Sequence, residues 1–204
     1  MQSMPSAMNS LFIDTIFEQY RQLGHRQYGE EVTELEHALQ AALLAQQHNE
    51  SPSLIAAALL HDCGHLLHGL DEGIASDGIN AAHEIVGADV LAIHFPPEVS
   101  EPVRLHVAAK RYLCRVNPSY LARLSSASQL SLELQGGPMT AEEANHFEKD
   151  PFFDPALRLR GYDDAAKMVG VTTPKMESFR SLLTPLLESR STLRRGVSEW
   201  EVER

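Results

Sequence analysis

The sequence has few features of a secreted or membrane protein. Its 204 residues include only two cysteines, Cys63 and Cys114, which are too few for a disulfide framework in a chain of this size. No 18 apolar residues occur consecutively, and residues 1–10 lack the basic region followed by an apolar run that marks a signal peptide. We therefore expect a reduced, cytoplasmic protein that has no membrane partner.

The chain also lacks an excess of positive charge. Its 17 Lys and Arg are outnumbered by 28 Asp and Glu, which gives a formal net charge of -11. Because such a field repels polyanions, we expect no nucleic acid as a partner. A small anion would need a local cluster of cations. The expected assembly is a monomer or a weak homo-oligomer.

No stretch alternates apolar and polar residues as a strand would, whereas start and stop signals of helices recur along the chain. Thr33 with Glu36, and Thr140 with Glu143, have the spacing of capping boxes. The main predicted helices cover residues 11–23, 33–48, 53–68, 79–95, 103–114, 155–168 and 174–188. We predict one all-α helical bundle over residues 10–189, with a flexible N-terminus at 1–9 and a C-terminal tail at 190–204.

Histidines recur at intervals of about one helix plus one connection. His37, His61, His83 and His106 are separated by 24, 22 and 23 residues, so consecutive helices of a bundle can bring their rings to one level. Asp62 follows His61 at the end of an apolar run, where an imidazole and a carboxylate are costly to bury without partners. This pattern predicts a buried metal site.

The His-Asp dyad at 61–62, together with His37 and Asp163, resembles the ligand pattern of the HD-domain superfamily. This quartet alone would hold one divalent ion. The two further histidines raise the ligand set to six side chains, which suits two ions, and mixed imidazole and carboxylate ligation suits iron or manganese better than zinc. In this interpretation Asp62 bridges the ions, of which one is held by His37, His61 and Asp163 and the other by His83 and His106.

Three further donor side chains lie one helical turn from an expected ligand, and they are Lys110, His65 and Arg160. On a helix, residues three or four apart share a face, so these groups can point into the same pocket as the ligands. The ordinary alternatives are a surface lysine and a histidine that bonds a backbone carbonyl. Ser128, in a run of small residues, is a weaker candidate by spacing alone.

Six segments together resemble one branch of the superfamily more closely, the HD-domain mixed-valent diiron oxygenases that cleave the carbon–phosphorus bond of 1-hydroxyphosphonates. The segments are LEHALQ (35–40), LLHDCGH (59–65), HEIVGAD (83–89), HVAAKRYL (106–113), LQGGP (134–138) and RGYD (160–163). The resemblance spans roughly residues 20–185, and residues 106–113 are its most specific part.

This resemblance implies roles for individual residues. The implied iron ligands are His37, His61, Asp62, His83, His106 and Asp163, among which Asp62, His83 and His106 have catalytic roles. The implied phosphonate-binding residues are His65, Lys110, Ser128 and Arg160. Tyr28 and Glu30 are implied to meet the amine end of the substrate. This chain departs from the family at the tyrosine, which stands two residues before the glutamate instead of three, so whether Tyr28 caps an iron is open.

The implied reaction belongs to phosphonate degradation. Two iron ions, Fe(II)/Fe(III), with O2 as co-substrate, would cleave an (R)-1-hydroxy-2-(amino or trimethylammonio)ethylphosphonate to glycine or glycine betaine and phosphate. Three other functions remain open from the residues: a dinuclear HD phosphohydrolase or phosphodiesterase, a polyol oxygenase related to myo-inositol oxygenase, and a non-catalytic module that binds a phosphorylated signal. Iron content and oxygen dependence distinguish an oxygenase from a hydrolase, and absence of any metal would favour the binding module.

Overall fold

The computed structural model describes residues 4–71 and 73–187, and every regular element in these ranges is helical, which confirms the all-α prediction. The α-helices are α1 (Met4–Leu23), α2 (Glu34–Gln47), α3 (Pro52–Leu60), α4 (Cys63–Leu67), α5 (His83–His94), α6 (Pro97–Val116), α7 (Pro118–Leu121), α8 (Ser126–Leu134), α9 (Ala141–Phe147) and α10 (Phe153–Ala165). A 3-10 turn at Met176–Phe179 then leads into helical residues 180–187.

Both predicted capping boxes are formed. The Thr33 side chain accepts a hydrogen bond from the Glu36 backbone N–H, and the Glu36 carboxylate accepts one from Thr33 N. Thr140 and Glu143 do the same at the start of α9. These reciprocal bonds satisfy backbone donors that a helix start otherwise leaves unpaired.

Several predicted helix boundaries were wrong, and the most consequential lies at the His-Asp dyad. The helix expected over residues 53–68 is interrupted, because α3 ends at Leu60 and α4 begins at Cys63. The helix expected from residue 79 begins instead at His83, directly after Ala82, whose φ of 47° is left-handed. The helix expected from residue 103 already begins at Pro97. Sharp changes of chain direction thus lie beside two candidate ligands.

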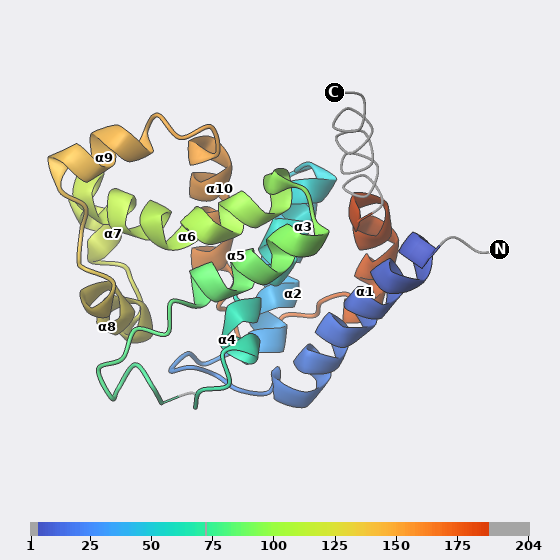
Figure 1. The fold of residues 1–204 in the computed structure, drawn as a ribbon. Helices are drawn as coiled ribbons and strands as arrows, with labels where there is room; N and C mark the ends of the chain where they lie inside the picture. Colours follow the sequence, from blue (N-terminus) through green and yellow to red (C-terminus); the bar gives the residue numbers. More distant parts are fainter. Residues whose placement is uncertain (1–3, 72, 188–204) are drawn as a thin grey trace, which may run out of the picture.

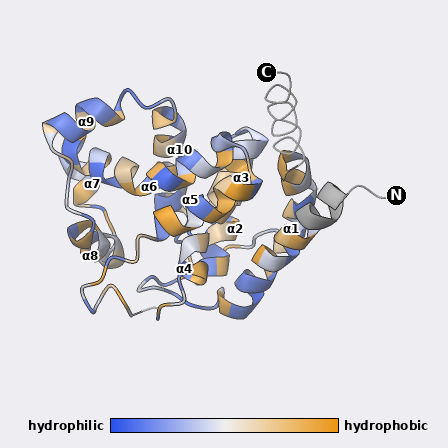
Figure 2. Cartoon of the chain, in the orientation of Figure 1, coloured by the Kyte–Doolittle hydropathy of each residue, from blue (hydrophilic) through white to orange (hydrophobic). Residues whose placement is uncertain are grey.

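Helix α3 lies at the centre of the bundle. All its residues from Leu54 to Leu60 are buried, and Figure 2 shows it as one of the most hydrophobic helices. Helices α2 and α6 pack against α3, and α5 and α10 pack against α6. Figure 1 shows α7, α8 and α9 gathered at one end of the molecule, whereas α1 lies beside the segment 176–187 at the other. The candidate ligands all come from α2, α5, α6, α10 and the connection that follows α3.

A glycine brings α4 and α5 close together. A Cβ atom at Gly64 would lie 1.9 Å from the carbonyl oxygen of His83, a distance that no side chain could tolerate. Glycine at this position therefore allows the start of α5 to pack against α4. The result is that His83 lies next to the His-Asp dyad.

The predicted domain limits are only partly covered by the described residues. Residues 4–9 belong to α1, whereas residues 1–3 and the predicted tail at 190–204 lie outside the described ranges. A domain spanning 10–189 therefore stays a prediction. None of the described helices combines the length and apolar character that a bilayer crossing requires.

Candidate metal centre and its pocket

The structure brings the six candidate ligands together from five parts of the bundle. They are His37 on α2, His61 and Asp62 between α3 and α4, His83 at the start of α5, His106 on α6 and Asp163 on α10. The four histidines and Asp163 are each at most 9% exposed. Such burial calls for a compensating partner for the polar atoms.

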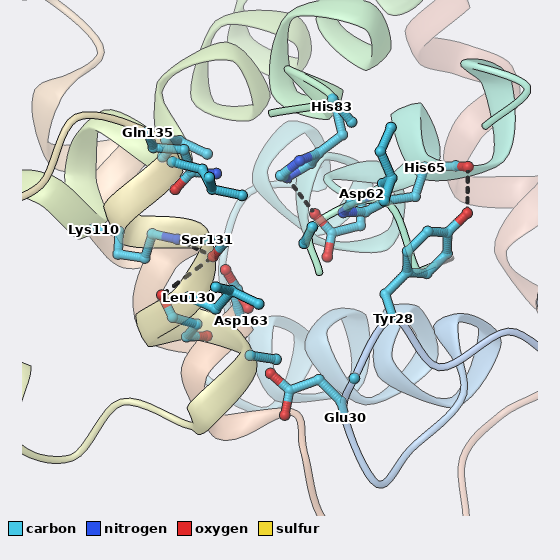
Figure 3. A pocket seen from close by; sticks show the side chains of 18 of the residues that line it. Tyr28, Glu30, Asp62, His65, His83, Lys110, Leu130, Ser131, Gln135 and Asp163 are labelled. Atoms are coloured by element: carbon cyan, nitrogen blue, oxygen red, sulfur yellow. Dashed lines mark hydrogen bonds and ion pairs between the residues drawn. The ribbon is translucent and has the colours of Figure 1, made fainter. Parts of the chain in front are cut away.

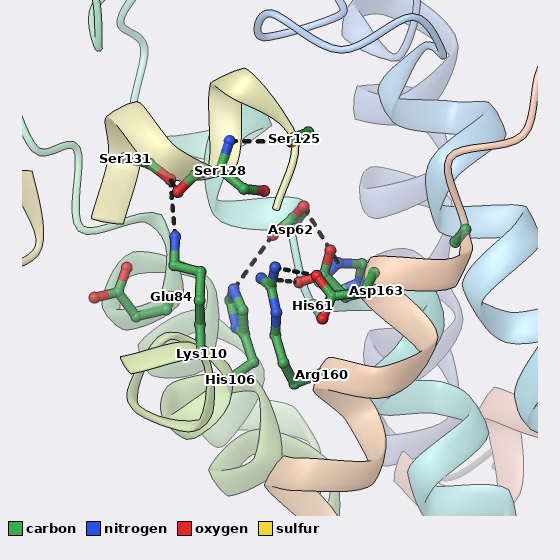
Figure 4. A network of polar contacts seen from close by, with 12 residues as sticks. His61, Asp62, Glu84, His106, Lys110, Ser125, Ser128, Ser131, Arg160 and Asp163 are labelled. Carbon is green, nitrogen blue, oxygen red and sulfur yellow. Dashed lines mark hydrogen bonds and ion pairs between the residues drawn. The ribbon is translucent and has the colours of Figure 1, made fainter. Parts of the chain in front are cut away.

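Asp62 lies between two groups of candidate ligand atoms. One carboxylate oxygen, Oδ2, is 3.4 Å from Nε2 of His37 and 3.2 Å from Nε2 of His61. The other, Oδ1, is 3.3 Å from Nε2 of His83 and 3.6 Å from Nε2 of His106. Figure 4 shows Asp62 between His61 and His106. Each group has its potential ligand atoms within 4.8 Å of one another, which suits one ion on each side of a bridging carboxylate.

Asp163 extends the first of these groups. Its Oδ1 is 3.4 Å from Nε2 of His37 and 3.9 Å from Nε2 of His61. His37, His61, Asp163 and Asp62 thus converge from helices α2 and α10 and from the connection between α3 and α4. This is the set that the sequence assigns to one ion, and its role as a ligand set stays a prediction.

The tautomers of three histidines follow from their backbone contacts. The Nδ1 atoms of His37, His61 and His106 lie 3.0 Å, 2.9 Å and 2.7 Å from backbone carbonyl oxygens. Because a carbonyl oxygen only accepts hydrogen bonds, each Nδ1 carries the proton and each Nε2 of the neutral ring keeps a lone pair. Such an arrangement prepares Nε2 to bind a metal ion.

The Nε2 atoms of the four histidines lie close together in pairs. Nε2 of His37 is 3.1 Å from Nε2 of His61, and Nε2 of His83 is 3.1 Å from Nε2 of His106. In the first pair both Nε2 atoms of the neutral rings are acceptors, and two acceptors at this distance repel unless a positive charge lies near both. In addition, the buried Oδ1 of Asp62 has no hydrogen-bond partner among the described residues. The donor set therefore fits a pair of cations.

The pKa values of the cluster agree with a need for positive charge. Burial opposes ionisation of Asp62, but His61, His37 and His83 outweigh it and hold the pKa of this carboxyl well below its usual range. Burial lowers the pKa of His37, but Asp163 and Asp62 outweigh that effect and raise it well above its usual range. A metal ion would replace the proton that these carboxylates attract. Burial lowers the pKa of His106 to about 3, which keeps this ring neutral.

Arg160 is held by groups within the protein. Its Nη1 donates to Oδ2 of Asp163 at 2.6 Å, its Nε donates to the Tyr120 hydroxyl at 2.8 Å, and its Nη2 donates to Asp164. Tyr120 in turn donates to Oδ2 of Asp164 at 2.6 Å. Arg160 lines the pocket, but these contacts serve to orient Asp163. Its predicted role in binding the phosphonate is untested.

A cavity of about 330 Å³ lies over the six candidate ligands, which we call the metal cluster. Figure 3 shows Asp62, His65 and His83 along one side and Lys110, Ser131 and Gln135 along another. Tyr28 lies beside His65, and Glu30 lies opposite His83. Residues of the 68–82 connection, including Ile74 and Ile79, complete the lining. The predicted substrate-binding residues all line this one cavity, and they are Tyr28, Glu30, His65, Lys110, Ser128 and Arg160.

Lys110 is a buried cation in this cavity. It is 3% exposed, and its Nζ donates to the Ser131 hydroxyl at 2.8 Å. Burial, together with Arg160, lowers the pKa of Lys110 to about 7. Ser131 was not predicted, although it follows Ser128 by three residues on one face of α8, and Gln135, directly after α8, follows it by four. An ammonium and hydroxyls on one wall can bind an anion.

His65 and Tyr28 form a second wall. The His65 ring stacks on that of His83 with centroids 4.0 Å apart, and burial lowers its pKa well below the usual range. The Tyr28 hydroxyl donates to the backbone oxygen of His65 at 2.8 Å, and its ring lies 4.4 Å from the His65 ring. Tyr28 thus braces His65 in this structure, and its hydroxyl is directed to a backbone oxygen.

Comparison with known proteins places this geometry in context. The model of the HD domain family matches residues 35–143, a range that includes all four cluster histidines and Asp62 but ends before Asp163. A hydroxymethylphosphonate dioxygenase of Gimesia maris is 46% identical over 179 residues, which cover 86% of this chain and 88% of the relative.

Two other relatives match over a similar length. A (1-hydroxy-2-(trimethylamino)ethyl)phosphonate dioxygenase (glycine-betaine-forming) of Leisingera caerulea is 42% identical over 178 residues, covering 87% of this chain and 89% of the relative. An uncharacterised protein of Acanthamoeba polyphaga mimivirus is 37% identical over 183 residues, covering 88% of this chain and 83% of the relative.

Proposed function

The chain belongs to the HD domain family and, within it, to the group that contains the phosphonate dioxygenases, and we propose that it is a diiron oxygenase that cleaves the carbon–phosphorus bond of a 1-hydroxyphosphonate with O2. One observation carries this proposal. The two groups of Nε2 atoms that share Asp62 lie at the floor of a cavity whose wall carries the buried cation Lys110. A dinuclear metal site beside an anion-binding wall is what a small phosphonate substrate requires.

In this proposal the products contain all the atoms of the substrate and of O2. A 1-hydroxyphosphonate dianion and O2 give a carboxylate, hydrogen phosphate and one proton. The iron pair, held by the six candidate ligands, supplies the redox chemistry with O2 when it is bound. The tasks that remain for the rest of the chain are to bind the phosphonate, to orient C1 and to keep the ligands in place.

The phosphonate dianion is proposed to bind between Lys110 and the serines of α8. The Lys110 ammonium, now bonded to Ser131, can donate to a phosphonate oxygen instead, and charge-assisted bonds of this kind are the stronger ones. Ser128 lies one turn from Ser131 on the same helix and lines the same cavity. These contacts would place the adjacent C1 hydroxyl over the metal cluster, where proximity favours reaction.

His65 and Arg160 are proposed to act next to this phosphonate-binding group. Nδ1 of His65 is buried and has no hydrogen-bond partner among the described residues, and the lowered pKa keeps the ring neutral. A neutral ring can donate to a substrate oxygen with one nitrogen without adding charge beside the metals. Arg160 would hold Asp163 in its charged, ligating orientation.

The experiment that tests this proposal compares phosphate release in air and under argon. Iron-loaded protein would be given hydroxymethylphosphonate, (R)-2-amino-1-hydroxyethylphosphonate, its trimethylammonio analogue and, as a control for hydrolysis, p-nitrophenyl phosphate. We expect release from at least one hydroxyphosphonate in air and none under argon. Release that is equal in both atmospheres, or release from the ester alone, would support the hydrolase instead.

A further inference from the structure

An ion pair joins three separate segments at the wall of the cavity across from His83. Nζ of Lys167, just after α10, donates to Oε1 of Glu30 at 2.5 Å and to the Ser128 hydroxyl at 3.1 Å. The Ser125 hydroxyl, at the start of α8, donates to the same Oε1 at 2.7 Å. The Lys167 and Glu30 side chains are only 20% and 22% exposed. We call this set of four residues the Glu30 bridge.

The Glu30 bridge lies between two cavities. The first is the cavity over the metal cluster, and the second is lined by Tyr120, Arg123 and Asp164 among others. Glu30 and Lys167 line both of them. Figure 3 shows Glu30 across the first cavity from His83. The bridge is therefore a wall that limits how far a substrate can extend away from the metal cluster.

The bridge also decides the charge at this end of the cavity. A glutamate that faced the cavity alone would attract a cationic group on the substrate. Here Lys167 neutralises Glu30, and Ser125 occupies the same carboxylate oxygen. An ammonium group beside Glu30 would therefore meet an ion pair that is already neutral.

We propose that Lys167 is a specificity-determining residue, which neutralises Glu30 and thereby makes the site prefer a 1-hydroxyphosphonate with a small, uncharged C1 substituent over one with an ammonium or trimethylammonium group. This inference rests on the proposed function, because it concerns the same cavity and substrate class. It assigns to Glu30 a contact within the protein in place of the contact with a substrate amine that the sequence predicts. It also gives a role to Lys167, which no pattern in the sequence marks.

The test isolates charge from size with a pair of matched ligands. In (R)-2-amino-1-hydroxyethylphosphonate and (R)-1-hydroxypropylphosphonate, an ammonium group and a methyl group of similar size occupy the same position. The quantity of interest is the ratio of kcat/KM for the neutral ligand to that for the cationic ligand. The same ratio is measured for binding, by calorimetry of the iron-loaded protein under argon, so that the result does not depend on turnover.

Four variants separate the bridge from general effects of charge. Lys167→Met removes the cation and leaves Glu30 free to attract an ammonium, whereas Lys167→Arg keeps the charge. The double variant Lys167→Met/Glu30→Gln removes both charges. Lys149→Met removes an equal charge from an exposed residue that does not line this cavity, and it serves as the matched control.

We expect the wild-type protein to favour the neutral ligand, and Lys167→Met to lower the ratio about tenfold, as loss of one partly buried ion pair allows. Lys167→Arg, the double variant and Lys149→Met should stay near the wild-type ratio. A Lys167→Met ratio equal to that of wild type, in protein that releases phosphate in air, would overturn this inference and leave the proposed function standing. A shifted binding ratio without phosphate release from any hydroxyphosphonate would support the role of Lys167 and overturn the proposed function.

Discussion

The side of the cavity that carries the metal cluster is built from helices, whereas the side that faces it is built largely from connections. The cluster histidines and Asp163 lie on α2, α5, α6 and α10 or, for His61, directly after α3, and they are at most 9% exposed. The opposite side uses residues 24–33 and 68–82, where Tyr28, Gly29, Gly69 and Gly78 have positive φ. Packed helices fix side chains closely, and connections vary more easily. We infer that the first side fixes the chemistry and the second selects the substrate.

The largest effect should come from the residue that both ligand groups share. Asp62→Asn removes the charge that faces all four histidines, and because loss of an outer-shell partner alone costs about 10–100-fold in metal affinity, we expect at least about a 100-fold loss here. Elemental analysis after dialysis and phosphate release in air are the measurements. Asp77→Asn, an exposed aspartate in the facing connection, is the control and should keep both. Equal iron content in Asp62→Asn and wild type would mean that Asp62 does not hold the metal ions, and would contradict the role given to this side of the cavity.

The next largest effect should be the loss of iron affinity in a variant of Arg160. This residue lines the cavity but bonds a candidate ligand, so its variant shows to which function the residue contributes. Arg160→Lys cannot reproduce the contacts to Asp163, Tyr120 and Asp164 together. We expect iron affinity to fall about tenfold, as for other groups that orient a metal ligand, with little change in KM at saturating iron. If KM rises while iron affinity is unchanged, Arg160 binds the phosphonate, as the sequence predicts.

A glycine-to-alanine substitution should destabilise the protein much more on the side of the metal cluster than on the facing side. Gly64→Ala puts a Cβ 1.9 Å from the His83 carbonyl oxygen, so we expect a loss of about 1–3 kcal/mol in the free energy of unfolding, as overpacking in a core typically causes. Gly73→Ala in the facing connection meets no atom within 4 Å and should change stability by less than about 0.5 kcal/mol. Urea denaturation of the two variants measures both. Similar losses would mean that the two sides are equally rigid.

A change of pH without any substitution should act on the cation at the boundary between the two sides. Lys110 has a pKa lowered to about 7, so its ammonium is present below pH 7 and is lost as the pH rises through that value. Since the phosphonate binds the charged form, we expect KM to rise by up to about tenfold per pH unit above 7. Lys110→Arg stays protonated and should remove this rise. A KM for wild type that stays flat from pH 6.5 to 8.5 would exclude Lys110 as the pH-dependent group.

The difference between the two sides also explains what the sequence could reveal. The spacing of His37, His61, His83 and His106 predicted their convergence because helices of a bundle repeat at a regular length. The interruption between α3 and α4 was missed because residues 53–68 contain no proline, and their one glycine, Gly64, lies after the interruption.

The facing side was less predictable for a physical reason. Lys167 contacts Glu30, 137 residues away in the chain, and a contact of this kind has no local periodicity to reveal it. Ser131 shares a helix face with Ser128, so the spacing did hold a usable signal there. Tyr28 and Glu30 line the cavity, but their partners, the backbone of His65 and the side chains of Lys167 and Ser125, depend on tertiary packing.

Iron titration of the metal-free protein, with phosphate release in air measured at each step, tests the central claim most directly. Two groups of histidines that share Asp62 predict that activity on a 1-hydroxyphosphonate rises until two iron ions are bound per chain, with one O2 consumed for each phosphate released. Full activity at one iron per chain, or phosphate release without O2 uptake, would contradict the account.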